Sequence, residues 1–227
     1  MATISLCMIV KNESAVLARC LDSIADLMDE IIIVDTGSTD NTKEIAAQYT
    51  SRIYDFKWTS DFSAARNFSF SKATMEYIYT ADADEILDDA NRERFLRLKD
   101  ALLPEIEIVQ MKYVTQGTFD TVLNAKKEYR PKLFRRLRTF TWIDPIHETV
   151  RLTPVTFDSD VEILHCPQSL HSKRDFSIFI KAFEHDGQFS PKIRTMYAKE
   201  LLKTGDKKDF TDAKPIFQLI FDNDPAD

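Results

Sequence analysis

The chain is poor in glycine and cysteine, and it lacks any long apolar run. Only four glycines occur among 227 residues, which excludes a linker-rich or low-complexity chain. The cysteines, Cys7, Cys20 and Cys166, fit no zinc-binding or Cys-x-x-Cys spacing, so we expect reduced thiols in the cytoplasm. No segment approaches the ~20 apolar residues that cross a bilayer, and no basic segment typical of a signal peptide opens the sequence.

A positive net charge is also lacking. The formal net charge is −7, which argues against nucleic acid as a partner because such proteins need a basic footprint. Basic residues nevertheless gather in one stretch, residues 126–138. This stretch could meet a diphosphate, an anionic acceptor or the inner face of the membrane, or it could be one solvated strand face, the more common outcome.

The first 82 residues alternate apolar runs with helical patterns. Nearly continuous apolar runs are typical of strands buried on both faces of a parallel sheet. Three segments with helical spacing separate four such strands, which predicts an α/β fold with a mostly parallel sheet. Ligands of these sheets bind beyond the carboxyl ends of the strands. We expect the strands at residues 4–10, 31–34, 52–58 and 76–82.

The remaining residues predict a mixed pattern and then a helical one. A charged helix is expected over 88–103, a strand exposed on one side over 105–116, and another strand within 155–167. After about residue 172 the pattern is helical, with Ser190 as an N-cap before a proline. We therefore predict two domains, residues 1–172 around the sheet and residues 173–227 as a small helical appendage.

Two carboxylates follow the fourth expected strand. Asp82 and Asp84 stand one residue apart, and at this spacing they can share one divalent cation. Oxygen ligands suit Mg²⁺ or Mn²⁺, and such an ion can neutralise a departing diphosphate. A solvated acidic loop is the alternative, but the position behind a buried strand favours a functional site.

Asp35 ends the second expected strand and precedes a turn that contains Gly37 and Ser38. Its carboxylate can accept hydrogen bonds from a base or a ribose. The same segment could also be only a tight turn with a helix cap. The glycine spacing matches neither the dinucleotide-binding fingerprint nor the P-loop, so a dinucleotide-binding fold is not supported.

Four segments together resemble family 2 glycosyltransferases of the GT-A fold, in the family's order, over roughly residues 3–170. The resemblance implies a Rossmann-like mixed sheet flanked by helices, a nucleotide-diphospho-sugar donor (a UDP-sugar is expected) and Mn²⁺ or Mg²⁺. It is greatest to bacterial members with a tetratricopeptide-like helical tail, although that tail's motif spacing matches only in part. The segments are CMIVKNESAVLARCLDSI, DEIIIVDTGSTDNTKEIA, DFSAARN and YIYTADADEIL.

The resemblance implies roles for five residues around the nucleotide. Val10, Asn12 and Glu13 match residues that line the nucleotide pocket. Asp35 matches the aspartate that contacts the uracil ring, and Arg66 matches an arginine near the base or the phosphates. The segment from Val10 to Glu13 lacks the hydroxyl residue of many relatives, which leaves the details of base recognition open.

For the metal, the resemblance implies Asp84 as a direct ligand and Asp82 as its partner, nearer the ribose. Some GT-A enzymes complete the metal shell with a late histidine. His165 ends an expected strand and is the candidate third ligand, with His171 as a weaker one. The alternative for His165 is a hydrogen-bonded histidine of the core.

In inverting members, a carboxylate takes the acceptor's proton on the face opposite the leaving group. One displacement then inverts the anomeric centre. Residues 144–150 are similar to the family's Ile-His-Glu segment, so Glu148 is the expected base and Asp144 the alternative. His147 beside it is expected to be structural, and Trp58 and Trp142 are expected in the core.

Several alternatives stay open at this point. A nucleotidyltransferase-like or non-catalytic sugar-nucleotide-binding module with a helical interaction tail is the second hypothesis, although no glycine lies in residues 7–16. No Q-x-x-R-W segment occurs, which argues against a processive polysaccharide synthase. The acceptor could be a saccharide, lipopolysaccharide, or a peptide or protein.

Overall fold

A computed structural model places most of the chain in two compact units. The first unit contains residues 1–58, 65–141 and 150–168, and the second contains residues 59–64, 142–149 and 169–227. The structure describes residues 1–115, 127–136, 142–143, 145, 149–150, 155–166 and 172–223.

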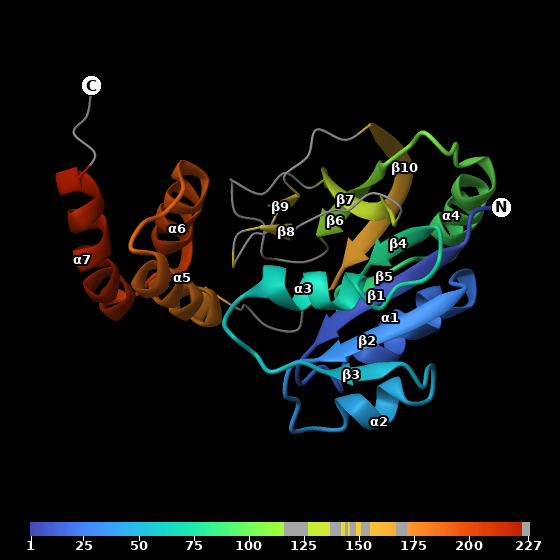
Figure 1. The fold of residues 1–227 in the computed structure, drawn as a ribbon, viewed down its shortest axis with the longest axis horizontal. Helices are drawn as coiled ribbons and strands as arrows, with labels where there is room; N and C mark the ends of the chain where they lie inside the picture. The colour runs from blue at the N-terminus through green and yellow to red at the C-terminus, as the bar shows by residue number, and fades with distance from the viewer. Residues whose placement is uncertain are drawn as a thin grey trace. The chain divides into compact units, whose positions relative to one another are not determined.

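An eight-stranded sheet forms the first unit, with the order β3-β2-β1-β4-β7-β6-β10-β5 (Figure 1). β1 pairs in parallel with β2 and β4, β2 with β3, and β6 with β10, while β7 runs antiparallel to β4 and β6. The predicted mixed, mostly parallel sheet is therefore confirmed. The strands are β1 Ile4–Val10, β2 Glu30–Asp35, β3 Ile53–Asp55, β4 Tyr77–Thr80, β5 Glu85–Ile86, β6 Ile108–Thr115, β7 Lys127–Arg135 and β10 Thr156–His165.

Helices cover both faces of this sheet. Alternate residues of β1 pack on opposite sides, since Leu6 and Met8 share a core cluster with α1 and α4 whereas Cys7 lies in a cluster beside α3. Burial on both faces explains why the strands read as continuous apolar runs. The helices of this region are α1 Leu17–Ile24, the 3₁₀ helix η1 Ala25–Leu27, α2 Thr42–Ala46, α3 Phe62–Phe70 and α4 Asp89–Ala101.

The helical pattern of residues 12–28 and the strand predicted at 52–58 are both longer than the observed elements. The first helix begins only at Leu17, because Asn12 has a left-handed backbone (φ 55°) and residues 12–14 bond to the loop after β2. The third strand is limited to Ile53–Asp55. By contrast, α4 begins where the sequence predicts, with the Asp88 carboxylate accepting from Asn91 N at 2.9 Å as its N-cap.

Three helices make up most of the described part of the second unit. The fully buried Tyr197 ring lies 4.5 Å from the Phe179 ring and 5.4 Å from the Phe217 ring, so aromatic packing joins all three helices. The predicted cap is confirmed, because Ser190 Oγ accepts from Ile193 N. The helices are α5 Ser172–Asp186, α6 Pro191–Thr204 and α7 Lys207–Asn223.

The helical C-terminal region is thus confirmed, while the boundary at residue 172 and the tetratricopeptide likeness stay predictions. Two short strands, β8 Trp142–Ile143 and β9 Thr149–Val150, pair with each other. Trp142 is buried as expected, and Trp58 is half-buried.

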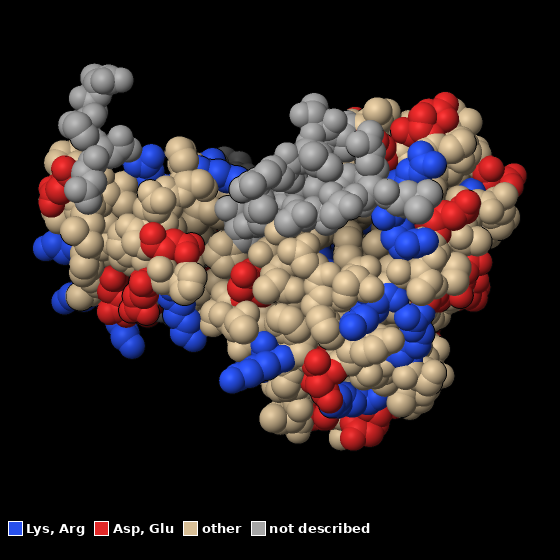
Figure 2. Space-filling view, in the orientation of Figure 1, with Lys and Arg blue, Asp and Glu red and all other residues tan. Residues whose placement is uncertain are grey.

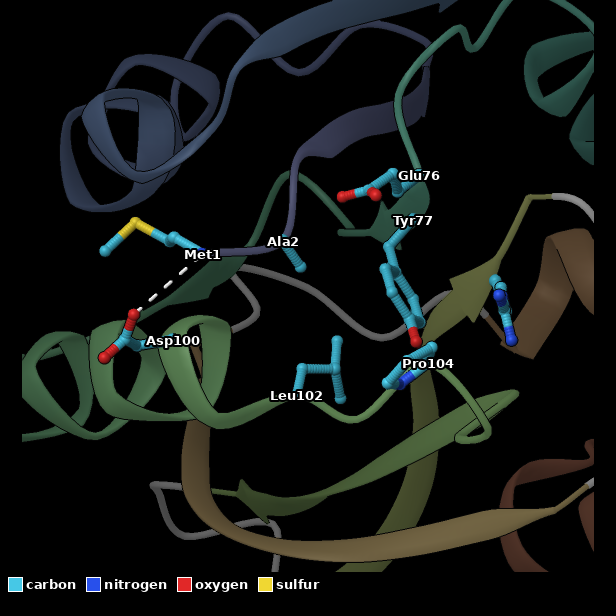
Figure 3. A pocket seen from close by; sticks show the side chains of 8 residues that line it. Met1, Ala2, Glu76, Tyr77, Asp100, Leu102 and Pro104 are labelled. Carbon is cyan, nitrogen blue, oxygen red and sulfur yellow. Dashed lines mark ion pairs between the residues drawn. The ribbon is translucent and has the colours of Figure 1, made fainter.

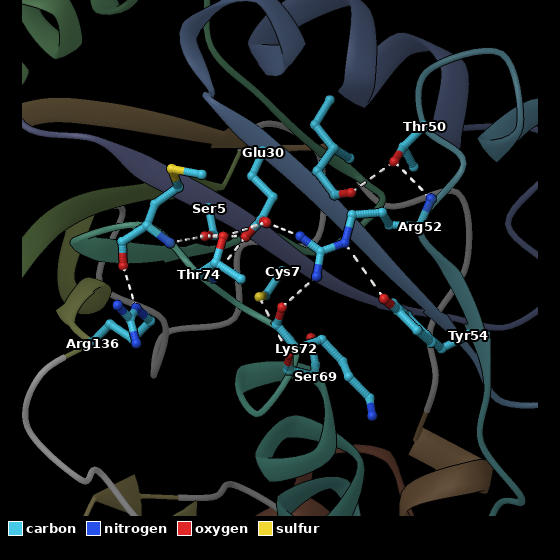
Figure 4. A network of polar contacts seen from close by, with 12 residues as sticks. Ser5, Cys7, Glu30, Thr50, Arg52, Tyr54, Ser69, Lys72, Thr74 and Arg136 are labelled. Carbon is cyan, nitrogen blue, oxygen red and sulfur yellow. Dashed lines mark hydrogen bonds and ion pairs between the residues drawn. The ribbon is translucent and has the colours of Figure 1, made fainter.

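A polar network links the amino-terminal ends of the parallel strands (Figure 4). Glu30 accepts hydrogen bonds from Ser5 Oγ at 2.5 Å and from Thr74 N at 2.9 Å, and it pairs with Arg52. Arg52 also donates to Lys72 O at 2.7 Å. The network joins β1, β2 and the segment before β3 to the segment before β4.

The same edge carries a hollow of about 250 Å³ (Figure 3). Tyr77, Glu76 and Arg135 line it, and the Met1 ammonium lies 4.0 Å from Asp100 Oδ1 beside it. Because β4 begins at Tyr77, this hollow lies at the edge opposite the tips that carry Asp35 and Asp82.

Neutralising Glu30 should destabilise the fold. Glu30→Gln leaves the Arg52 guanidinium without its countercharge in a half-buried position, so we expect a loss of about 2 kcal/mol in the free energy of unfolding. Urea denaturation measures this loss. The control is Lys43→Gln, which breaks the exposed pair with Asp55 and should change stability little. Equal losses in both variants would contradict this role of Glu30.

Candidate active site

The parallel strands β2, β1 and β4 end at one edge of the sheet. Val10 at the end of β1 is the register partner of Asp35 at the end of β2. β4 also runs parallel to β1, and Asp82 follows its last residue, Thr80. The structure therefore brings Asp35 and Asp82 to the same edge.

Asp35 is almost fully buried, and half of its carboxylate organises the following turn. Its Oδ1 accepts from Gly37 N and Ser38 N, both at 2.9 Å. Gly37 has φ 104°, a conformation that favours glycine. Within the described residues, Asp35 Oδ2 is buried without a hydrogen-bond partner. An unpaired buried acceptor costs about 1–3 kcal/mol, so this oxygen suits a ligand N–H donor.

The loop after β1 is tied to the loop after β2. Asn12 Oδ1 accepts from Thr39 N at 2.7 Å, and Glu13 N donates to Thr42 Oγ1 at 2.8 Å. Asn12 thus braces the two loops. The Val10 side chain lies in the core, and its carbonyl accepts from Thr36 N, so only its backbone lies at the edge.

The loop after β4 folds back towards a distant strand. Glu85 in β5 pairs with His165 at the end of β10, and Cys166 N donates to Asp84 O at 3.0 Å. This pairing places His165 Nε2 3.0 Å from Asp84 Oδ2. The structure therefore brings together two of the three predicted metal ligands.

The donor set of this pair fits Mn²⁺ or Mg²⁺ only in part. In the described part of the chain, no three His, Cys, Asp or Glu side chains are grouped to hold a metal ion, so Asp82 is not gathered with Asp84 and His165. A carboxylate and an imidazole can still hold such an ion when phosphate oxygens and water complete its shell.

Cations surround Asp82, which remains solvent-exposed. Although the side chain reaches solvent, the protein atoms packed around the carboxylate raise its pKa. The charges of Lys132, Arg66, Arg130 and His165 outweigh this effect, so the pKa of Asp82 is lowered. Asp82 is therefore ionised at neutral pH. Arg66, from α3, is close enough to act on this carboxylate, and its role near the base or the phosphates stays a prediction.

Sequence reasoning missed a stack of side chains beside this loop. The Tyr113 ring from β6 is buried, and its centroid lies 4.9 Å from that of the His165 ring. On the same Tyr113 ring, the Arg130 guanidinium carbon lies 3.7 Å from the centroid, a cation–π distance. The sequence signals were the alternation of residues 105–116 and the basic stretch at 126–138. Neither shows that β6 and β7 lie beside His165.

The basic stretch is not one solvated face, as its commoner interpretation held. Lys132 is buried against Glu85, whereas Arg136 Nε, beyond the other end of β7, donates to Met75 O. Figure 2 shows positive and negative side chains interspersed on the face it displays. Residue 126 and residues 137–138 of the stretch lie outside the described residues.

The expected base and its neighbours cannot be placed in the same way. Glu148, Asp144, His147 and His171 all lie outside the described residues. Their roles stay predictions.

Comparisons with known proteins identify the family of the chain. The sequence model described as "Glycosyl transferase family 2" matches residues 5–153. The chain belongs to glycosyl transferase family 2.

Among curated relatives, glycosyltransferase SunS of Bacillus subtilis is 33% identical over 132 residues, covering 56% of this chain and 31% of SunS. A TPR repeat-containing protein of Synechococcus elongatus is 48% identical over 87 residues, covering 38% of this chain and 22% of the relative. The chain thus spans less than a third of the length of these relatives.

A solved structure confirms the GT-A-like fold. Glucosyl-3-phosphoglycerate synthase from Mycobacterium tuberculosis, in complex with Mn²⁺, UDP-glucose and phosphoglyceric acid, superposes with a TM-score of 0.58 at 19% identity. The match covers 84% of this chain and 82% of that one. Among the helices described here, none is both long and apolar enough to cross a membrane.

The loop between β2 and α2 should respond to acid through Asp40. Burial opposes ionisation, but hydrogen bonds from Ser14 and Thr42 lower the pKa of Asp40 to about 2, from 3.8. Since the folded pKa is the lower one, Asp40 stabilises the fold above pH 3.8, and this contribution disappears as the pH falls through 2.

Asp40→Asn should therefore lose about 1 kcal/mol of stability at pH 6, after allowance for solvent screening, and almost none near pH 2. Urea denaturation of both proteins across this pH range measures the difference. A deficit that is the same at every pH would contradict the assignment.

Proposed function

We propose that the chain transfers a sugar from a nucleotide-diphosphate donor, with a UDP-sugar expected, to an acceptor nucleophile by one metal-assisted, inverting displacement. The proposal rests on one observation: a candidate base-binding residue and a candidate metal-binding loop lie at the same edge of the sheet. Asp35, with its unpaired buried oxygen, ends β2, and the loop that carries Asp84 towards His165 leaves the sheet at β4, two strand spacings or about 10 Å from β2. A nucleoside diphosphate is long enough to reach both.

At the nucleotide end, Asp35 Oδ2 would accept a hydrogen bond from a ring N–H of the base. A uracil ring offers such a donor. Asp82, which is ionised, exposed and two residues before Asp84, would accept from the ribose hydroxyls. The Asn12 brace keeps the two loops around the base together.

At the diphosphate end, Asp84 and His165 would hold Mn²⁺ or Mg²⁺. When bound, the ion would neutralise negative charge on the departing diphosphate. Arg66 and Arg130 lie near the Asp82 carboxylate and would donate to phosphate oxygens.

In the displacement, the acceptor's oxygen or sulfur forms a bond to the anomeric carbon as the bond to the diphosphate oxygen breaks. Glu148, with Asp144 as the alternative, would take the acceptor's proton on the face opposite the leaving group. The nucleoside diphosphate leaves with the electron pair of the broken bond, and the anomeric centre is inverted.

Family membership supports sugar transfer over the nucleotidyltransferase-like or non-catalytic alternative. Solved structures of glucosyl-3-phosphoglycerate synthase from Mycobacterium tuberculosis contain Mn²⁺ with UDP-glucose or Mg²⁺ with UDP, which agrees with the expected donor and cofactor. For the acceptor, saccharide, lipopolysaccharide and peptide or protein all remain. A relative named for lipopolysaccharide core biosynthesis, LpsC of Rhizobium meliloti, is 31% identical over 99 residues.

Calorimetric titration of UDP, GDP, dTDP and UDP-glucose, each with and without Mn²⁺, tests the proposal. Wild-type chain should bind a uridine nucleotide only in the presence of the metal. Asp84→Asn should weaken this binding by at least about tenfold, since a charged metal ligand is lost. The matched control is Asp89→Asn on α4, which should bind like wild type. Binding that does not depend on the metal would contradict the role of Asp84.

Asp35→Asn separates base recognition from metal binding. The new amide can still accept from Gly37 N and Ser38 N, but in that orientation its NH₂ group cannot accept from a base. We expect UDP affinity to fall by about tenfold while its dependence on Mn²⁺ remains. The control is Asp55→Asn at the register-paired position of β3. Unchanged UDP affinity in Asp35→Asn would remove Asp35 from the nucleotide site.

A further inference from the structure

A buried ion pair anchors the loop that carries Asp82 and Asp84. Lys132 Nζ lies 2.5 Å from Glu85 Oε1, and the two side chains are only 7% and 2% exposed. Glu85 directly follows Asp84 in the chain. Charges buried this completely are costly and need good pairing, so the position of each side chain constrains the other.

Lys132 reaches Glu85 because β7 is irregular at this point. In the pairing of β6 with β7, Val109 faces Leu133 but Gln110 faces Pro131, so Lys132 is an extra residue, a β-bulge. Pro131 has no N–H to donate, and within an interior strand proline is tolerated at bulges. The bulge directs the Lys132 side chain out of the regular ladder.

The bulge also coincides with the end of the β4–β7 ladder. The last register pair is Tyr79 with Leu133. Beyond it, β4 continues through Thr80 into the loop with Asp82. Lys132 therefore lies next to the point where the chain leaves the sheet for the candidate metal site.

Besides the side-chain contact of Asp84 with His165, hydrogen bonds to backbone atoms hold this loop. Asp82 O accepts from Glu85 N at 3.1 Å and from Cys20 Sγ at 3.5 Å, and Asp84 O accepts from Cys166 N at 3.0 Å. These bonds define the turn and attach it to α1 and to the end of β10. The ionic contact with Lys132 adds an attachment to the middle of the sheet.

We propose that Lys132 is a positioning residue, which acts through Glu85 to hold Asp84 against His165 and so sets the affinity for a divalent cation with a nucleoside diphosphate. This inference rests on the proposed function. Its geometric part, the fixing of the loop by the buried pair, can be measured without any ligand.

The first test is Lys132→Met in the full chain. Calorimetry with Mn²⁺ and UDP should show affinity at least about tenfold weaker than wild type, and the electron paramagnetic resonance spectrum of bound Mn²⁺ should change. Affinity within twofold of wild type would overturn the proposal.

The control for general destabilisation is Lys99→Met. Lys99 is another buried lysine, 7% exposed, and its Nζ lies 2.7 Å from Asp29 Oδ2 at the other end of the sheet. This variant should lose stability as Lys132→Met does, yet bind Mn²⁺ and UDP like wild type. An equal loss of binding in both variants would show that Lys132 acts only through stability and would overturn the proposal.

Lys132→Met with Glu85→Gln covers the case in which the single variant does not fold, because this double variant buries no unpaired charge. We expect it to fold and still bind at least about tenfold more weakly, since the loop lacks its anchor. Binding within twofold of wild type would overturn the proposal.

Hydrogen exchange separates this inference from the proposed function. Without ligand, the amides of Glu85 and Cys166 should exchange at least about tenfold faster in the double variant than in wild type. The amide of Thr36, bonded to Val10 O at the same edge, should not change. If wild type binds no nucleotide, the proposed function fails, and these exchange rates alone decide whether Lys132 positions the loop.

Discussion

The candidate site depends on the parallel pairing of β1 with both of its neighbours. Parallel strands end at the same edge, so the pairing of β1 with β2 and β4 fixes where Asp35 and Asp82 emerge. Antiparallel pairing of either neighbour would send its carboxylate to the opposite edge. Helices cover both faces of the sheet. A ligand can therefore reach the polar groups only in the loops beyond the strand ends.

Charge at this edge is balanced locally within an acidic chain. The carboxylates of Asp82 and Asp84 would repel a diphosphate if they stood alone. Arg66, Arg130 and Lys132 lie close enough to lower the pKa of Asp82. A site with both signs of charge can bind a cation and an anion together, which is the requirement of a metal–diphosphate complex. The net charge of the chain is therefore a poor guide to the charge of the ligand that we propose.

Sequence patterns predicted the strands that lead to Asp35 and Asp82, because a short apolar run followed by a carboxylate is a local signal. They could not place Tyr113, Arg130 or the contact between Asp84 and His165. These depend on which strands pair across the second half of the sheet, and β10 reaches the Asp84 loop only by pairing with the two-residue β5. The buried Lys132 was hidden within a run of basic residues, since burial depends on a bulge that no periodicity reveals.

The two edges of the sheet differ in how well their polar groups are satisfied. At the amino-terminal edge, Glu30 is bonded to Ser5, Thr74 and Arg52. At the other edge, Asp35 Oδ2 and Glu85 Oε2 are buried without partners among the described residues, and burial raises the pKa of Glu85 in spite of the nearby Lys132.

Each unsatisfied group lowers the stability of the free protein, and a ligand that supplied a donor to Asp35 Oδ2 would recover part of that loss on binding. The edge with satisfied polar groups therefore maintains the alignment of the strands, while the edge with unpaired acceptors keeps them available for the proposed nucleotide. Buried acceptors without partners occur at the edge where the chemistry is proposed, as expected when an arrangement serves binding rather than stability.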